Sequence, residues 1–153
     1  MTTHKKSRLP RSQPERITEL AEFRYRLRRF LQFSETTADA AGISAQHYQL
    51  LQVIAAVPEG EASTISYIAG RMLLRHNSAV ELVDRAERAE LVRRLADERD
   101  LRRSLVEITE RGSVLLARLV KQHLEALETD GPELVETLDA VMASKPMARR
   151  VAG

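Results

Sequence analysis

The segment from Ile68 to Thr109, IAGRMLLRHNSAVELVDRAERAELVRRLADERDLRRSLVEIT, has the most definite pattern in the chain. It begins with two short stretches in which apolar residues recur at helical spacing, and the second runs from His76 to about Ala89. Residues 91–95 and 104–108 are typical of two strands that flank a charged tip. The segment therefore predicts two helices joined by a tight turn and followed by a β-hairpin.

This order of elements is the layout of a winged helix-turn-helix. In that layout the second helix enters the major groove of DNA, and the hairpin, called the wing, reaches the minor groove. We therefore expect a mainly α fold with a small β-wing, and DNA binding is the first interpretation of its function.

The composition is compatible with this interpretation and excludes several others. The chain has 153 residues, of which 43% are apolar, and a formal net charge of +2, so a strongly basic coat is absent. It has no cysteine, which excludes disulfides, thiolate metal sites and cysteine redox sensing. No apolar run suits a signal peptide or a membrane helix, so we expect a soluble cytoplasmic protein.

Neither a cofactor nor a metal is expected. The four histidines are scattered without the spacing of metal ligands. No glycine-rich phosphate loop, nucleophile elbow or coherent acid–base set is present, so an enzyme is not expected.

The predicted winged helix-turn-helix, residues 61–109, is flanked by helices at 12–57 and 110–145 within one domain, 12–145. A basic arm, 1–11, is expected before it, and a frayed tail, 146–153, after it.

The flanking helices have their own start and stop signals. Ser12 and Glu15 fit a capping box for a helix that ends near residue 34, and Ser44 starts a second helix that ends near residue 56. The run 129–132 is expected to break the C-terminal helix, with Pro132 starting the last one. The terminal helices are more apolar than a single copy can cover, which predicts a C2 homodimer.

Over roughly residues 12–145 the chain resembles the MarR family of transcription regulators. Residues 68–72 look like the first helix of the family's helix-turn-helix, and residues 76–88 look like its recognition helix. Asp100-Leu101-Arg102, followed by residues 105–109, looks like its wing signature. The resemblance implies N- and C-terminal dimerisation helices around the winged helix and a small-molecule pocket. Two residues depart from the pattern, because Leu73 and Glu90 stand where glycines are usual.

The candidate DNA contacts lie in the wing and at the start of the recognition helix. Arg102 is the expected minor-groove probe, with Asp100 holding its guanidinium. Arg85 is expected to reach a base or a phosphate, and the pairs Glu81–Arg85 and Asp84–Arg88 are expected along the helix. In the alternatives, the wing tip is a solvated charged turn, and Asn77 or Ser78 only caps the helix. The remaining candidates are Arg75, His76, Asn77, Ser78, Arg99, Arg103, Ser63, Thr64 and Ser66.

An effector site is predicted from two arginines one turn apart, Arg24 and Arg28, which could hold an anion. His47 and Tyr48 could add a titratable group and a ring. The alternative is structural, with the arginines paired to acids of neighbouring helices and His47 in a first turn. His123 is expected on the surface or on the dimer face.

These observations predict a dimeric, sequence-specific repressor that binds double-stranded DNA at a pseudo-palindromic operator. A small aromatic or anionic ligand would release it. The alternative is a winged-helix module for protein–protein interaction without specific DNA binding. The acidic residues Glu81, Asp84, Glu87 and Glu90 are the argument for that alternative.

Overall fold

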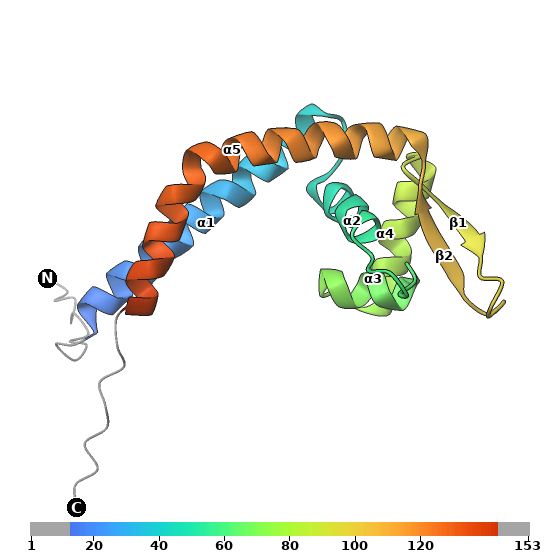
Figure 1. Ribbon diagram of the computed structural model, residues 1–153, viewed down its shortest axis with the longest axis horizontal. Coiled ribbons are helices and arrows are strands. Elements are labelled where there is room, and N and C mark those ends of the chain that lie inside the picture. Colours follow the sequence, from blue (N-terminus) through green and yellow to red (C-terminus); the bar gives the residue numbers. More distant parts are fainter. Residues whose placement is uncertain (1–12, 144–153) are drawn as a thin grey trace, which may run out of the picture. The chain divides into compact units, whose positions relative to one another are not determined.

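The computed structural model describes residues 13–143 and has the mainly helical fold with a small antiparallel sheet that the sequence predicts. The predicted arm, Ser12 and the last ten residues lie outside the described residues. In chain order the elements are α1 (Pro14–Ala40), α2 (Ala45–Ala55), α3 (Ile65–Met72), α4 (His76–Arg88), β1 (Val92–Ala96), β2 (Ser104–Ile108) and α5 (Glu110–Ala143) (Figure 1).

The chain divides into two compact units, and each boundary falls inside a long helix. Residues 33–125 form the first, which we call the winged-helix unit. Gln13, residues 14–32 of α1 and residues 126–143 of α5 form the second, which we call the terminal-helix unit.

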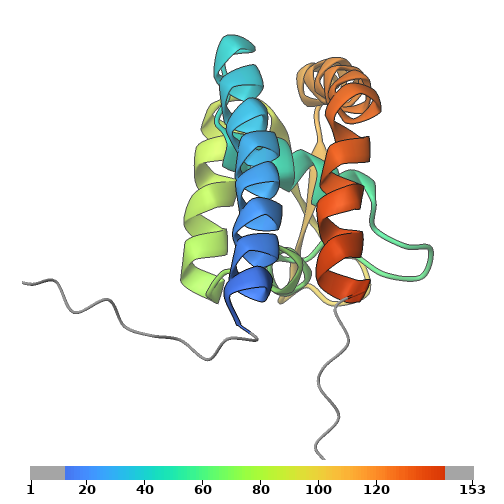
Figure 2. The ribbon, with the colours of Figure 1, turned by 90° about the vertical axis from the view of Figure 1, so that its left-hand side faces the viewer.

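In the terminal-helix unit, the two helical segments run antiparallel beside each other (Figure 2). Arg26 joins them, because it binds Glu133 across the pair and Glu22 one turn earlier on its own helix. Much apolar surface remains exposed in this unit: Ile17 is 48% exposed, Leu20 50%, Val135 56% and Met142 75%. The unit therefore presents an apolar face that the described residues do not cover.

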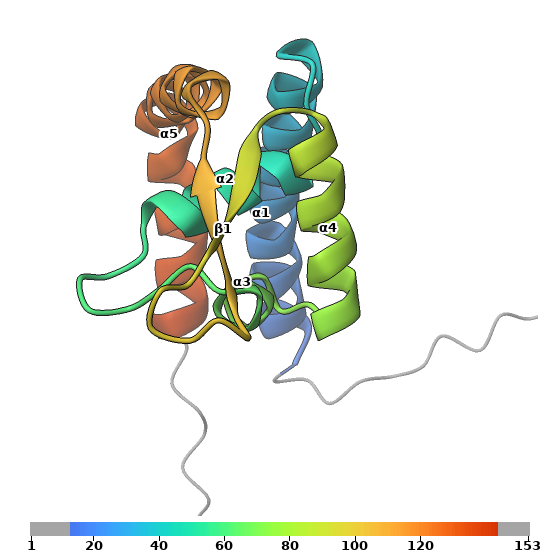
Figure 3. The ribbon, with the colours of Figure 1, turned by 90° about the vertical axis from the view of Figure 1, so that its right-hand side faces the viewer.

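The winged-helix unit holds the core of the protein. Leu50 and Leu51 of α2, Ile68 of α3 and Leu82 of α4 are at most 1% exposed, and Leu119 of α5 closes the same cluster. Figure 3 shows α4 beside the β1–β2 hairpin in this unit. The core thus holds the helix-turn-helix and the wing together as one body.

Side-chain caps start two of the helices, α2 at Ser44 as predicted and α3 at Thr64. The Ser44 hydroxyl accepts a hydrogen bond from the His47 N–H at the start of α2, and the Thr64 hydroxyl accepts one from the Tyr67 N–H at the start of α3. Thr64 also forms a single β-bridge with Leu105.

Two predicted helix ends are wrong. The first helix continues to Ala40 because Ser34 and Ala38 are buried in the winged-helix unit, and this packing outweighs weak local propensity. The break at 129–132 is absent, and α5 runs through Pro132. Leu127, Leu134 and Leu138 stand at i, i+7 and i+11, so one apolar stripe continues across the proline. We attribute the continuous helix to this stripe.

His123 was expected on the surface or on the dimer face, but it is 6% exposed and packs inside the winged-helix unit. Its Nδ1 lies 2.7 Å from the Leu119 carbonyl oxygen, which can only accept, so Nδ1 carries a hydrogen. Its Nε2 lies 2.9 Å from the Ser34 hydroxyl, and its ring lies 4.5 Å from that of Tyr48. His123 is therefore a satisfied core histidine that joins α1, α2 and α5.

The backbone leaves α4 through a left-handed residue. Glu90 has φ 60°, a conformation that favours glycine, and so does Leu73, with φ 55°, in the turn between α3 and α4. The Thr109 hydroxyl donates to the Glu90 carbonyl at 2.6 Å, and the Thr109 N–H donates to the Leu91 carbonyl. These bonds hold the start of the wing against the start of α5.

Gly112 makes this junction possible. A Cβ at this position would lie 2.2 Å from the Leu91 carbonyl oxygen and 2.8 Å from Cγ2 of Ile108. The first neighbour is backbone and cannot rotate away, so any side chain at residue 112 must displace the chain.

We expect Gly112→Ala to lower the free energy of unfolding by about 1–3 kcal/mol, because of this clash. Urea denaturation is the measurement. Gly131→Ala is the matched control, since its Cβ would meet nothing closer than 3.9 Å in the same helix. The control should gain up to about 1 kcal/mol from helix propensity. Equal effects of the two substitutions would contradict the clash.

Glu90→Gly should raise the free energy of unfolding by up to about 1 kcal/mol, because glycine adopts the left-handed conformation without strain. Glu90→Ala removes the same charge but keeps the strain, so it should give no gain. A stabilisation of equal size in both variants, measured by thermal or urea unfolding, would assign the effect to charge instead.

Candidate nucleic-acid interface

The start of α4 presents polar groups to solvent. Arg75 occupies the cap position, and its side chain makes no capping hydrogen bond. Asn77 and Ser78 lie in the first turn with exposed side chains, so the alternative in which one of them caps the helix is wrong. The helix start, with His76 also exposed, therefore offers free N–H groups and short donors to an anion.

The buried face of α4 determines which residues point outward. Ala79, Leu82, Val83 and Ala86 are at most 1% exposed, and Val80 is half-buried. The opposite face of the helix carries the stripe Asn77, Glu81, Asp84 and Arg88, spaced at i, i+4, i+7 and i+11.

Arg85 lies on a flank of α4, close to His47 of α2. Burial, and then the charge of Arg85, lower the pKa of His47. Arg88 instead shares the outward stripe with Asn77. In the sequence Arg88 was considered only as an ion-pair partner. Its helical spacing from Asn77, opposite the apolar positions of the helix, is the signal that could have identified it as a candidate DNA contact.

The acidic residues of α4 are not paired along the helix. Among the described residues, neither Glu81–Arg85 nor Asp84–Arg88 forms an ion pair, so that expectation is wrong. Arg94 of β1 instead reaches Asp84 at 2.6 Å and Glu87 at 3.0 Å. No local sequence pattern signals this contact, because it joins a strand to a helix.

The wing tip is organised by Asp97, whose side chain is 6% exposed. Its carboxylate accepts hydrogen bonds from the Arg99 N–H at 2.9 Å and from the Arg103 guanidinium at 2.9 Å. The Arg99 N–H, and then Arg103, lower the pKa of Asp97, while burial acts in the opposite direction. Asp97, which was not among the candidate site residues, thus positions the turn at the wing tip.

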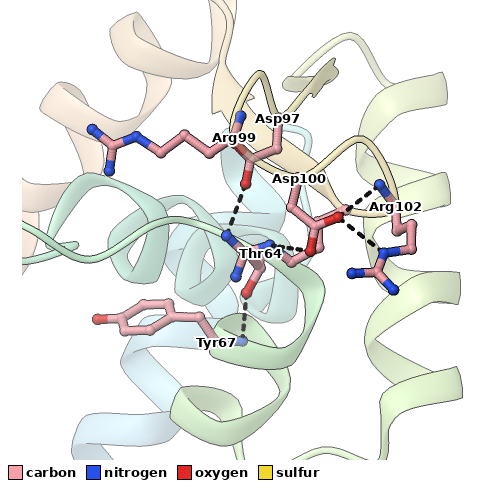
Figure 4. Close-up of polar contacts among 7 residues, drawn as sticks. Thr64, Tyr67, Asp97, Arg99, Asp100 and Arg102 are labelled. Carbon is pink, nitrogen blue, oxygen red and sulfur yellow. Dashed lines mark hydrogen bonds and ion pairs between the residues drawn. The ribbon is translucent and has the colours of Figure 1, made fainter.

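Among the arginines that form ion pairs in the wing, Arg102 is the most exposed, with 93% of its side chain accessible. The Asp100 carboxylate accepts from its N–H at 3.1 Å and from its Nε at 3.2 Å, which is the predicted contact. Figure 4 shows Asp100 facing Arg102, while the Arg99 side chain extends away from both. Asp100 thus orients the guanidinium through its Nε edge, and the other guanidinium nitrogens remain exposed to solvent.

Two other candidates have structural partners. The Ser63 hydroxyl donates to the Val106 carbonyl at 2.6 Å, and the Val106 N–H donates to the Ser63 carbonyl, so this serine pairs with the wing. Thr64 caps α3. Ser66 has an exposed side chain on the first turn of α3. Of these three, Ser66 is the one placed to reach a phosphate without losing a contact.

The effector candidates fall in both units. Arg24 and Arg28 are exposed on α1, and within residues 13–143 neither forms the ion pair that the structural alternative required. His47 of α2 has a buried Nε2 without a hydrogen-bond partner. Tyr48 is 2% exposed, and burial raises its pKa, so a ligand would reach its ring only if the core opened.

Over the described part of the chain, no cluster of three potential metal ligands is found. None of the helices there is both long and apolar enough to cross a membrane.

The contribution of Asp97 should depend on pH. A carboxylate with a lowered pKa stabilises the fold above its unfolded pKa, near about 4, and this stabilisation is lost as the pH falls through the folded pKa. Wild type should therefore exceed Asp97→Asn in free energy of unfolding at neutral pH, and the difference should shrink in acid. Urea titrations across this range test it, with Glu98→Gln, an exposed carboxyl of the same tip, as control. A difference that is constant with pH would contradict the assignment.

Comparison with known proteins connects this geometry to a family. A family model described as MarR family matches residues 41–103. Among solved structures, the chain is similar to AbsC, a MarR family transcriptional regulator from Streptomyces coelicolor, with 21% identity and a TM-score of 0.70 over 92% of this chain and 95% of that one. A search of curated protein sequences gave no match.

Two further solved structures have the same fold. A MarR family protein from Bacillus stearothermophilus is 21% identical, with a TM-score of 0.63 over 83% of this chain and 90% of that one. MepR of S. aureus, solved as a complex with DNA, is 18% identical, with a TM-score of 0.59 over 80% of this chain and 98% of that one. At such identities the structural likeness establishes the fold.

Proposed function

We propose that the chain is a member of the MarR family, whose model matches residues 41–103, and that it is a dimeric, sequence-specific DNA-binding transcription regulator. One observation carries the proposal. An uncapped polar helix start at Asn77 and an oriented, exposed arginine at Arg102 belong to the same compact unit. The first suits the major groove, and the second suits the narrow, electronegative minor groove.

A second copy of the chain is the proposed partner for the terminal helices. The exposed apolar residues of α1 and α5 would cost free energy in water, and a twofold-related copy presents the same face to cover them. Two recognition helices related in this way would read a pseudo-palindromic operator. Such a regulator would act in the cytoplasm as a repressor.

A small anionic ligand is the proposed effector. Arg24 and Arg28 support this, because both are exposed, one turn apart and without an acidic partner among residues 13–143. The ligand would lower DNA affinity by favouring a dimer conformation in which the recognition helices no longer match the operator.

The alternative of a protein-binding module loses part of its support. It rested on the acids of α4, and two of them, Asp84 and Glu87, are compensated by Arg94. Salt dependence separates the two functions, since phosphate contacts give a steep loss of affinity with salt.

Fluorescence anisotropy on DNA from upstream of the protein's own gene, with a scrambled duplex as control, tests the function. Binding near 10⁻⁸ M, at least about 10³-fold tighter than to the scrambled duplex at physiological salt, is expected. Equal, weak binding to both that is also obtained with a pool of genomic fragments would refute it.

Arg102→Ala should weaken binding to the specific duplex about tenfold or more, because the minor groove loses its cation. Sedimentation should show an unchanged dimer. Arg118→Ala removes the same charge from the exposed surface of α5 and serves as the control. Unchanged affinity in the Arg102 variant would remove the wing from the interface.

A further inference from the structure

The guanidinium of Arg94 bridges two carboxylates of the helix proposed to read DNA. Its Nη2 lies 2.6 Å from Asp84 and its Nη1 3.0 Å from Glu87, while its own backbone N–H donates to the second oxygen of Glu87 at 3.1 Å. The Arg94 side chain is only 26% exposed, against 48% for Asp84 and 43% for Glu87. The arginine thus lies behind the carboxylates, and the carboxylates face solvent.

The charge of α4 makes this contact important. The helix carries three acids, Glu81, Asp84 and Glu87, against two arginines, and Asp84 stands on the outward stripe with Asn77 and Arg88. Uncompensated carboxylates in a DNA groove meet phosphates of the same sign, and such juxtaposition is costly. A cation from the neighbouring strand removes that cost without occupying the groove.

We propose that Arg94 is a positioning residue that determines DNA affinity through Asp84 and Glu87, as their intramolecular counter-ion. It neutralises the two carboxylates and, through them, ties β1 to α4, so that the wing and the helix approach DNA as one surface. The proposal rests on the proposed DNA-binding function and adds to it a residue that acts without touching DNA.

The neighbouring residue provides a matched control. Arg93 also lies on β1, but successive strand residues face opposite sides, and Arg93 pairs with Glu107 of β2 at 2.6 Å. Replacing it removes the same charge from the same strand and leaves Asp84 and Glu87 compensated.

The test measures binding to the upstream duplex and to a random duplex at low salt, by anisotropy, for four variants. Arg94→Ala should bind about tenfold or more weakly to both duplexes, and Arg93→Ala should bind less than about threefold more weakly. Arg94→Ala combined with Asp84→Asn and Glu87→Gln should recover most of the lost affinity. Asp84→Asn with Glu87→Gln alone should bind at least as tightly as wild type, since the cation is kept and two anions are removed.

Each other outcome overturns the proposal. If the triple variant stays as weak as Arg94→Ala, the arginine contacts phosphate directly. If Arg94→Ala matches Arg93→Ala, the counter-ion is immaterial. If Arg94→Ala does not fold, as judged by circular dichroism, the double variant still decides, and weaker binding than wild type refutes the idea. Failure of wild type to bind either duplex or genomic fragments would refute the function itself, and the counter-ion role with it.

Discussion

The left-handed turn at Glu90 is the constraint on which the proposed DNA-binding surface depends. It ends the recognition helix and sends the chain directly into β1, while Thr109 bonds to the carbonyls of Glu90 and Leu91. Gly112 leaves the space that the Leu91 carbonyl occupies. Three segments with different roles therefore meet in one joint: the recognition helix, the wing and the first turn of α5. The direction in which the wing leaves α4 follows from backbone geometry at that joint, and the charged side chains act on a frame already in place.

On that frame three arginines of the wing, Arg94, Arg102 and Arg103, are held by acids to different degrees. The side chains of Arg94 and Arg103 are 26% and 51% exposed, and each binds a carboxylate that compensates its charge within the fold. Arg102 keeps an exposed guanidinium, and its partner Asp100 bonds to its N–H and Nε, which orients the group without enclosing it. This division explains how a chain with a net charge of only +2 can present a local cationic probe. The acids that reduce the net charge are the ones that hold the cations in position.

The parts of the fold that could be predicted are those specified by local patterns. The start of α4 at His76 and the strand Ser104–Ile108 follow from periodicity and turn residues, and both were predicted at the correct residues. The helix break predicted at Pro132 is wrong, because the proline, a local helix breaker, was given more weight than the apolar stripe that continues past it. The Arg94 contacts could not be predicted, because the helix-to-strand angle that brings β1 against Asp84 depends on the Glu90 turn. In the candidate site, the Asp100–Arg102 contact was predicted because the two residues are only two positions apart in the sequence. The role of Asp97 could not be predicted, because it depends on the fold of the whole tip.

A rigid joint between α4 and the wing also restricts how a ligand could act. If the helix and the wing move as one body, an effector cannot lower affinity by bending the wing away from the helix. In the proposed dimer it would have to change the separation of the two winged helices, and to reverse a 99:1 population of two dimer states it would have to bind the minor state about 10⁴-fold more tightly. A group inside the winged-helix unit, such as His47, is poorly placed to do this, since it sits on the body that moves. Arg24 and Arg28 belong to the unit that carries the uncovered apolar face, so an anion bound to them would act on the proposed dimer contact itself. These two arginines are therefore better placed than His47 to convert the binding of a ligand into a change of DNA affinity.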